Sequence, residues 1–551
     1  MEVISHSGLL PKESTNRGLV NFATGALVDS EIAHDILHAR SMGTKDFEIA
    51  LQYYFFKNPS IKFQKRKRKL LTFSTIQKKR RRQSPAKQEQ KTITICTKRA
   101  IAWATQQQTS NECIGVQFIE QPRAFVDIHN MPTKGQKSYI TKNLAACYST
   151  TILDKSLPDQ WIPELAVIDG MFLIHVKPFG RDTHFKEYVR LLLRRFIQPH
   201  FKQGAREVHV IFDKPPQSNF NPKQWEQEKR DMQQTTSTHI HDISDTTRVP
   251  SNWKEFIACR QCKQSLAQYL SVKMLAFSPS IMTTTEQKLI TAGPTEPMSC
   301  TMMGIISNED HYKTDAQEAD SRILRHCQQS HLYRQYIFSP DTDTYIIGLT
   351  NHKPGAETFI DLTPVGSEDS KIMNLNKLID SMKSDPDLAF IEQDTLPTVL
   401  QSLYASTGCD YNPFFAGIGK GSFLKAFYTH AEFISSDGSL SNIDPNNEQG
   451  YLSFLRLVGT ASFLMYRATY HGTKSPVHLF HSCKSTSSLE QHIMWLNKIR
   501  EHVWVHTHEE KNLLPSHTAL KLQWLRALWV VHLWSQAGSQ HTEILPPTQH
   551  G

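Results

Sequence analysis

The stretch that decides the fold class is Ala166-Val167-Ile168-Asp169-Gly170, a short apolar run that ends in an acid. A second run of this kind occupies residues 208–212 and ends at Asp213, and a third, residues 336–338, leads to a further pair of acids. Short apolar runs bounded by polar residues and turn signals are typical of buried β-strands. The three runs therefore predict three strands that each end in carboxylates.

The segments between and after these runs favour helices. Residues 185–201 carry apolar side chains at helical spacing, and an earlier helix is expected around residues 30–56. Strands that alternate with helices predict a parallel sheet covered by helices. The last part of the chain is also expected to be mostly helical, most clearly at residues 452–466, 489–505 and 516–534. We therefore expect an α/β fold with a helical C-terminal region.

The length of 551 residues allows two or three domains, and we expect three regions. Residues 1–160 form an extra N-terminal region of unassigned fold, which contains a basic linker at about residues 62–82. Residues 161–430 form the α/β core, and residues 431–551 form the helical C-terminal region. Within the core, about residues 217–310 are polar and rich in Gln, Thr and Ser, so that they are expected to be an insertion that forms an arch or faces the substrate.

The positive charge of the chain is concentrated in one segment. The formal net charge is +9, and two clusters, residues 65–69 and 78–82, contribute ten cations. Two basic clusters with a short spacer are typical of a bipartite nuclear-import signal, and the same residues can bind nucleic-acid phosphates. A merely solvated basic linker is the alternative. From the basic clusters we expect a nuclear protein that uses the import machinery. No apolar stretch reaches the roughly 18 residues of a membrane helix, so we expect no membrane segment.

Nine cysteines are scattered along the chain without the pattern of a disulfide framework. Cys259 and Cys262 have the spacing of a zinc knuckle, but no second pair follows to complete the four ligands of a zinc site. We therefore expect reduced thiols, either structural or exposed, rather than bound zinc.

The acids that follow the expected strands are the candidate site. They are Asp169, Asp213, Asp341 and Asp343. In an open parallel sheet, ligands bind outside the carboxyl ends of the strands, where neighbouring strands end at the same edge. These four acids are therefore expected to converge on one place, although they lie far apart in the sequence.

A fourth element adds two more acids, Glu318 and Asp320, at the start of an expected helix. An N-cap at Asp315 with Glu318 as its capping-box partner is the alternative, although it does not account for Asp320. Carboxylates gathered in one cleft repel one another unless cations offset them, and hard ions such as Mg²⁺ or Mn²⁺ prefer oxygen ligands. Such ions activate water and stabilise charge on a phosphate, so phosphodiester hydrolysis is the reaction that this set fits best.

A glycine-rich turn follows Asp410, and Gly417, Gly419 and Gly421 in this turn lead into an expected helix at residues 423–427. Glycines at a helix start let backbone N–H groups approach a phosphate closely. A simple corner between two helices is the alternative for the glycines. The cationic residues that we expect to contact DNA are Lys420, Lys425, Arg190, Arg194 and Arg195. For the three arginines, a solvated basic helix face is the alternative.

The order of these motifs resembles one known family. VIDG, VIFDKPP, QEAD, SPDTD and TGCDYNPFFAGIGKGSFLKAF are similar to the motifs of the flap endonuclease/XPG family of PIN-like nucleases, over about residues 161–430. The resemblance implies a PIN-like fold and a structure-specific DNA endonuclease, or 5′ nuclease, with two Mg²⁺ ions. It implies that residues 407–427 form a helix-hairpin-helix element that binds duplex DNA, often with K⁺. The implied metal ligands and catalytic residues are Asp169, Asp213, Glu318, Asp320, Asp341, Asp343 and Asp410.

The chain departs from this family in its N-terminal region and in one acidic motif. About 160 residues precede the first expected strand, whereas the family begins close to it, and the family's ExE is ExD at Glu318 and Asp320. The whole chain also resembles a group of multicopy animal proteins associated with mobile elements, through its NLNKL, PDLA, HAEF and LPSHTAL stretches. Two further functions therefore stay open: a catalytically inactive nucleic-acid-binding protein of mobile-element origin, and a PIN-type ribonuclease that acts on RNA.

Overall fold

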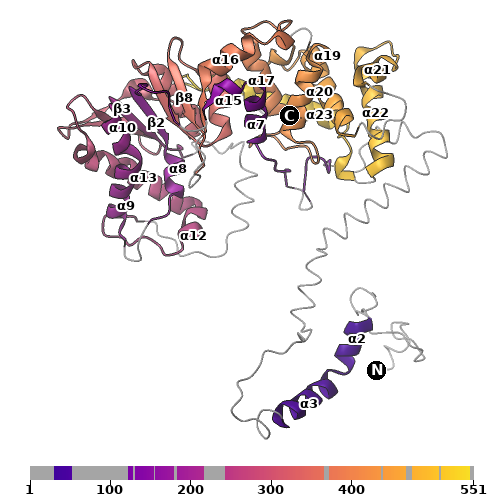
Figure 1. Cartoon of the computed structure of the whole chain (residues 1–551), viewed down its shortest axis with the longest axis horizontal. Helices are drawn as coiled ribbons and strands as arrows, with labels where there is room; N and C mark the ends of the chain where they lie inside the picture. Colours follow the sequence, from indigo (N-terminus) through magenta and orange to yellow (C-terminus); the bar gives the residue numbers. More distant parts are fainter. Residues whose placement is uncertain are drawn as a thin grey trace. The chain divides into compact units, whose positions relative to one another are not determined.

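The computed structural model divides the chain into two compact units, residues 1–92 and 93–551. The first unit contains α2 (Ser30–Leu37) and α3 (Ala39–Ala50), drawn in indigo in Figure 1. These two helices lie where the sequence predicts one. The predictions for the basic linker and for the N-terminal import signal fall outside the described residues. The structure describes residues 30–52, 122–127, 131–153, 156–178, 183–215, 242–364, 371–435, 439–466, 475–507 and 510–545.

The second unit is built on a mixed sheet of nine strands, in the order β1-β9-β8-β7-β2-β3-β4-β5-β6. The five central strands, from β8 to β4, run parallel to their neighbours, and the outer strands pair antiparallel. The strands are β1 (Ile152–Leu153), β2 (Leu165–Asp169), β3 (Glu207–Ile211), β4 (Lys288–Ala292), β5 (Met298–Thr301), β6 (Ile306–Asn308), β7 (Arg334–Phe338), β8 (Glu357–Asp361) and β9 (Ile372–Asn374).

Helices cover both faces of this sheet, as Figure 1 shows. One layer contains α8 (Gly170–His175), α9 (Phe185–Leu192), a π-helical turn (Leu193–Ile197), α10 (Gln198–Gln203), α12 (Trp253–Ala258) and α13 (Arg260–Phe277). The other layer contains α7 (Tyr139–Cys147), α14 (Ala319–Gln329), α15 (Thr342–Asn351), α16 (Leu375–Lys383) and α17 (Leu396–Ser406). The predicted α/β architecture, a parallel sheet flanked by helices, is confirmed.

The alternation of side chains along β2 explains why both layers form. Leu165 and Val167 belong to the hydrophobic cluster on the face of α14 and α17, whereas Ala166 and Ile168 belong to the cluster on the face of α8 and α13. All four side chains are fully buried. A strand covered on both faces carries apolar residues at every position, which is the pattern that the AVI run shows.

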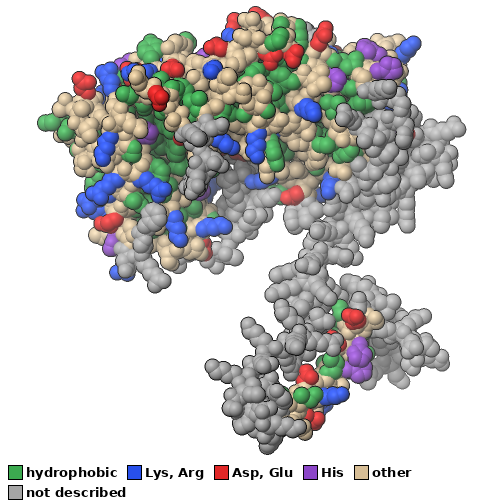
Figure 2. All heavy atoms as spheres, in the orientation of Figure 1, with side chains coloured by type: hydrophobic (Ala, Val, Ile, Leu, Met, Phe, Trp, Pro, Cys, Tyr) green, Lys and Arg blue, Asp and Glu red, His purple; other side chains and the backbone are tan. Residues whose placement is uncertain are grey.

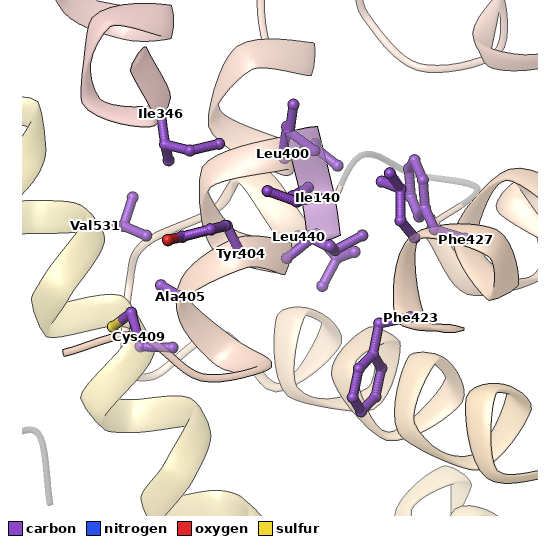
Figure 3. Packing of buried hydrophobic residues seen from close by; sticks show 14 of the residues in the cluster. Ile140, Ile346, Leu400, Tyr404, Ala405, Cys409, Phe423, Phe427, Leu440 and Val531 are labelled. Atoms are coloured by element: carbon purple, nitrogen blue, oxygen red, sulfur yellow. The ribbon is translucent and has the colours of Figure 1, made fainter. Parts of the chain in front are cut away.

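The C-terminal region is helical, as predicted, and shares the larger hydrophobic cluster with the sheet layer. Its helices are α18 (Lys420–Thr429), α19 (Ala431–Ser435), α20 (Glu448–Tyr466), α21 (Pro476–His481), α22 (Ser488–Thr507) and α23 (His517–Ser535). Figure 3 shows Ile140 of α7 among Leu400, Tyr404 and Leu440, with Val531 of α23 nearby. One continuous core therefore joins α7, the sheet layer and the C-terminal helices.

The structure corrects the expected insertion at about residues 217–310. From residue 253 onward this stretch forms α12, α13 and three strands of the sheet, and β4 pairs parallel with β3 in full register. The sequence did not predict these elements because polar residues interrupt their apolar pattern: α13 has only one buried face, and β4 is short. The division into three regions stays a prediction, although α7 and β1 precede residue 160 and belong to the second unit. Among the helices of the described residues, none combines the length and apolar character that crossing a membrane takes.

Candidate metal centre

The carboxyl ends of three adjacent parallel strands, β7, β2 and β3, define the site. Ile168 of β2 pairs with Val210 of β3 on one side and with Phe338 of β7 on the other. The residues that follow these strands therefore leave the sheet side by side, as predicted. They include Asp169 at the end of β2, Asp213 after β3 and Asp341 after β7.

Asp169 is both the last residue of β2 and the N-cap of α8. Its Oδ1 accepts hydrogen bonds from the backbone N–H groups of Met171, at 2.8 Å, and Phe172, at 3.3 Å. Burial raises the pKa of Asp169 to about 7, and the nearby charge of Asp213 acts in the same direction. A nearby cation compensates for the burial and for the repulsion, and so favours the ionised form of this carboxyl group at neutral pH.

Asp213 ties the end of β3 to the start of α14. Its Oδ1 accepts a hydrogen bond of 2.9 Å from the backbone N–H of Ala319, the first residue of that helix. Glu318 occupies the N-cap position, and its side chain makes no capping hydrogen bond. Asp315 instead lies 2.9 Å from Nδ1 of His541. The capping-box alternative for Asp315 and Glu318 is therefore wrong.

Asp320, Asp341 and Asp343 form the tightest part of the site. One carboxylate oxygen of each lies within 4.8 Å of those of the other two. The Thr344 hydroxyl donates to Asp320 at 2.5 Å, and the backbone N–H of Asp343 donates to Asp341 at 3.0 Å. Burial raises the pKa of Asp320 well above its ordinary value, and the charges of Asp341, Asp169 and Asp343 raise it further. The donor set consists of hard oxygens, which fits a divalent ion such as Mg²⁺.

Two residues that the sequence did not single out contact this group. The Tyr404 hydroxyl of α17 donates to Oδ1 of Asp343 at 2.5 Å. Lys137 Nζ lies 2.7 Å from Oδ2 of Asp343, 2.8 Å from Oδ2 of Asp410 and 3.7 Å from Oδ1 of Asp341. Neither residue lies in a motif with a spacing signal, and Lys137 precedes the first predicted strand. Lys137 also brings Asp410 to the group.

Six of the seven predicted acids are thus linked to one another through contacts or through electrostatic influence. They are Asp169, Asp213, Asp320, Asp341, Asp343 and Asp410. Glu318 stands next to Ala319, which binds Asp213. Within the described residues, only Asp320, Asp341 and Asp343 of this set have metal-ligand spacing. Cys259 and Cys262 lie elsewhere, buried at the start of α13.

The glycine-rich turn lies between α17 and α18, as expected, and only part of it is open. Gly417 has a φ of +80°, and Gly419 is the N-cap of α18; both are exposed. Lys425 is exposed as well. Lys420, in contrast, is 1% exposed, and its ammonium donates to the carbonyl oxygen of Tyr404 at 2.5 Å. In this arrangement Lys420 reaches no phosphate, which corrects its predicted role as a DNA contact.

The three predicted arginines are exposed on one helical segment. Arg190 lies in the last turn of α9, with its guanidinium over the ring of Phe277, and Arg194 and Arg195 follow in the π-helical turn. Figure 2 shows Lys and Arg side chains gathered over the part of the molecule that contains α9, α12 and α13 in Figure 1. This basic surface is available to a polyanion.

No family model and no curated protein matches the chain. Among solved structures, the chain is similar to the catalytic core of Rad2 in complex with DNA substrate, at 14% identity and a TM-score of 0.29, over 67% of this chain and 96% of that one. It is also similar to human GEN1 in complex with Holliday junction DNA, at 12% identity and a TM-score of 0.28, over 62% of this chain and 80% of that one.

Proposed function

We propose that this protein is a divalent-metal-dependent nuclease of the flap endonuclease/XPG-like, PIN-like type that hydrolyses phosphodiester bonds in DNA. The observation that carries the proposal is the approach of Asp320, Asp341 and Asp343 within 4.8 Å at the carboxyl end of parallel strands. Burial, and then the repulsion between neighbouring acids, raise the pKa values of Asp169 and Asp320, and a bound divalent ion would offset both effects.

The residues of the chain have distinct roles in this proposal. Asp341, Asp343 and Asp410 bind one ion, and Asp169, Asp213, Glu318 and Asp320 bind a second or orient its water molecules. When bound, Mg²⁺ or Mn²⁺ activates a water molecule and stabilises the charge of the scissile phosphate. Thr344 and Tyr404 hold the carboxylates of Asp320 and Asp343 in place by hydrogen bonds.

DNA is the proposed substrate because the described surface carries exposed cationic groups and an open backbone at a helix start. Arg190, Arg194 and Arg195 are exposed, and Gly417 and Gly419 present open backbone at a helix start, which suits a phosphate. K⁺ at this turn, structure-specific cleavage and nuclear localisation through the basic clusters are further parts of the proposal.

The test uses the full-length protein with Mg²⁺ on flap, bubble, nicked and single-stranded DNA, and on RNA. We expect Asp341→Asn and Asp343→Asn each to lower the cleavage rate by about 100-fold or more. The reason is that bound metal ions lower the barrier to phosphodiester hydrolysis by several kcal/mol. Asp394→Asn is the matched control, since Asp394 is an exposed acid paired with Lys383 away from the site. Undiminished Mg²⁺-dependent cleavage by the Asp341/Asp343 double variant would refute the proposal.

One observation favours a second candidate, a nucleic-acid-binding protein that does not cleave. Lys137 already supplies a positive charge to Asp343 and Asp410. A protein that only binds nucleic acid needs no metal at this place. Isothermal titration of the protein with Mn²⁺ separates the candidates, since binding that is lost in Asp343→Asn is expected of the nuclease alone. Cleavage of RNA but not DNA in the first assay would indicate a ribonuclease.

A further inference from the structure

The segment that carries Lys137 is firmly built into the second unit. Ile140 and Leu144 of α7 are fully buried in the larger hydrophobic cluster. The backbone of this segment also binds the glycine-rich turn, because the N–H of Phe414 donates to the carbonyl oxygen of Thr133 at 3.0 Å. Lys137 therefore reaches the acids from a fixed backbone and not from a loose surface chain.

The approach between this segment and the turn is close. A Cβ added to Gly135 would lie 2.2 Å from the ring of Phe414, and a Cβ added to Gly421 would lie 2.6 Å from Nδ2 of Asn143. Thr141 Oγ1 lies 3.1 Å from the hydroxyl of Tyr345 on α15. Residues 131–147 therefore contact both the helix that carries Asp343 and the turn that follows Asp410.

The ammonium group of Lys137 occupies the position at which a divalent metal ion would contact Asp343 and Asp410. It contacts Oδ2 of Asp343 at 2.7 Å and Oδ2 of Asp410 at 2.8 Å, and 17% of its side chain is exposed. A metal ion that binds the same oxygens would stand within a few ångströms of this ammonium. Two cations at such a separation in a partly buried site repel each other strongly.

We propose that Lys137 is the resident counter-cation of the acidic site, which a divalent ion has to displace before it binds Asp343 and Asp410. Lys137 is then a positioning residue that lowers metal affinity and stabilises the metal-free protein. Because it sits on residues 131–147, metal binding also changes the contact between this segment and the site. The inference concerns the regulation of the same site and rests on the proposed metal-dependent function.

The experiment compares Mn²⁺ binding by isothermal titration and thermal unfolding in full-length wild type and Lys137→Met, both freed of metal with chelator. We expect Lys137→Met to bind Mn²⁺ about tenfold more tightly, because the ion no longer replaces a charged hydrogen-bond donor. We also expect a lower unfolding temperature without metal and a larger rise on adding Mn²⁺. Lys137→Arg keeps the charge and should behave as wild type does.

The matched control is Lys142→Met, because Lys142 lies five residues further along the same segment, on α7, is exposed and lies over the ring of Tyr139. It should change neither binding nor unfolding. Equal or weaker Mn²⁺ binding by Lys137→Met, with wild type binding normally, would overturn the counter-cation role and leave the proposed function intact. Failure of both proteins to bind Mn²⁺ would overturn the two together. Should Lys137→Met not fold, Lys137→Gln serves in the same comparison.

Discussion

At the scale of single residues, the interactions of the site meet at Asp343. Only 4% of its side chain is exposed, and each of its two oxygens has a donor: the Tyr404 hydroxyl on Oδ1 and the Lys137 ammonium on Oδ2. The two donors differ in kind, because a tyrosine can stay beside a carboxylate that binds a metal, whereas an ammonium adds a competing charge. Tyr404 therefore sets the orientation of Asp343, and Lys137 sets the charge around it.

This difference makes Tyr404→Phe an informative substitution. The variant removes one hydrogen bond from Asp343 and keeps the ring of Tyr404 in the core. We expect metal affinity or cleavage rate to fall by about tenfold, as is usual when a group that orients a metal ligand is lost. Tyr451→Phe is the control, because its hydroxyl also binds a single partner, the carbonyl oxygen of His517, but far along the chain from the site. Equal effects of the two variants would show that the loss comes from stability and not from the orientation of Asp343.

At the scale of elements, the connection between α17 and α18 places Asp410. Gly408 adopts a φ of +117°, a conformation that other residues rarely adopt, and a Cβ there would lie 2.7 Å from the Cα of Phe414. The turn therefore requires glycine at this position, two residues before Asp410. The backbone of the turn is fixed further by Cys409, whose N–H donates to the carbonyl oxygen of Asn412 at 3.0 Å.

Gly408→Ala should consequently disturb both the turn and the metal site. We expect a loss of about 1–3 kcal/mol in the free energy of unfolding, the usual cost of a strained backbone conformation, and weaker Mn²⁺ binding as Asp410 moves. Thermal unfolding and isothermal titration measure the two effects. Gly419→Ala in the same turn is the control for stability, because Gly419 has an ordinary φ and a Cβ there meets nothing within 4 Å. If Gly408→Ala unfolds as Gly419→Ala does, the turn does not depend on glycine at 408.

The elements also show how far the sequence alone predicts this molecule. The aspartates after β2, β3 and β7 could be placed together because a short apolar run ending in an acid implies a strand end, and parallel strands end at one edge. Lys137 could not be predicted, since its contact with Asp343 spans 206 positions and follows no spacing rule. The burial of Lys420 was also missed, because a lysine beside exposed glycines looks identical in sequence whether it faces solvent or Tyr404.

At the scale of the whole molecule, the second unit depends on a continuous core that reaches from the sheet to the last helix. Trp524, Trp529 and Trp534 of α23 are buried in this core. The chain after α23 also binds the layer that carries the acids: the Arg325 guanidinium donates to the carbonyl oxygen of Gly538 at 2.8 Å, and His541 pairs with Asp315. The C-terminal region therefore supports the acidic site through packing, although it contributes none of the site's contacts described above.

The stability of the whole molecule should respond to acid through buried groups with opposite effects. Burial lowers the pKa of His200, on α10, from its ordinary value of 6.5 to about 4, while the charge of Asp361 acts in the other direction. Between these values the unfolded chain binds a proton that the folded protein does not, so His200 contributes its full stabilisation above about pH 6.5 and loses it as the pH falls toward 4. Asp169 has the opposite effect, because its folded-state pKa of about 7 lies above the ordinary value of 3.8, so that its ionisation lowers stability as the pH rises toward 7.

Comparing wild type with His200→Gln separates these two contributions, because both proteins retain Asp169. We expect wild type to lose about 2 kcal/mol more stability than the variant when the pH is lowered from 7 to 5, since one pKa unit corresponds to 1.36 kcal/mol. Thermal or urea unfolding followed by circular dichroism at the two pH values, without metal, gives the difference. Equal losses in the two proteins would mean that the imidazole of His200 accepts a proton in the folded state at little cost. The acid sensitivity would then have to come from other buried histidines. His492 is one of these, because burial lowers its pKa to about 4 in the same way.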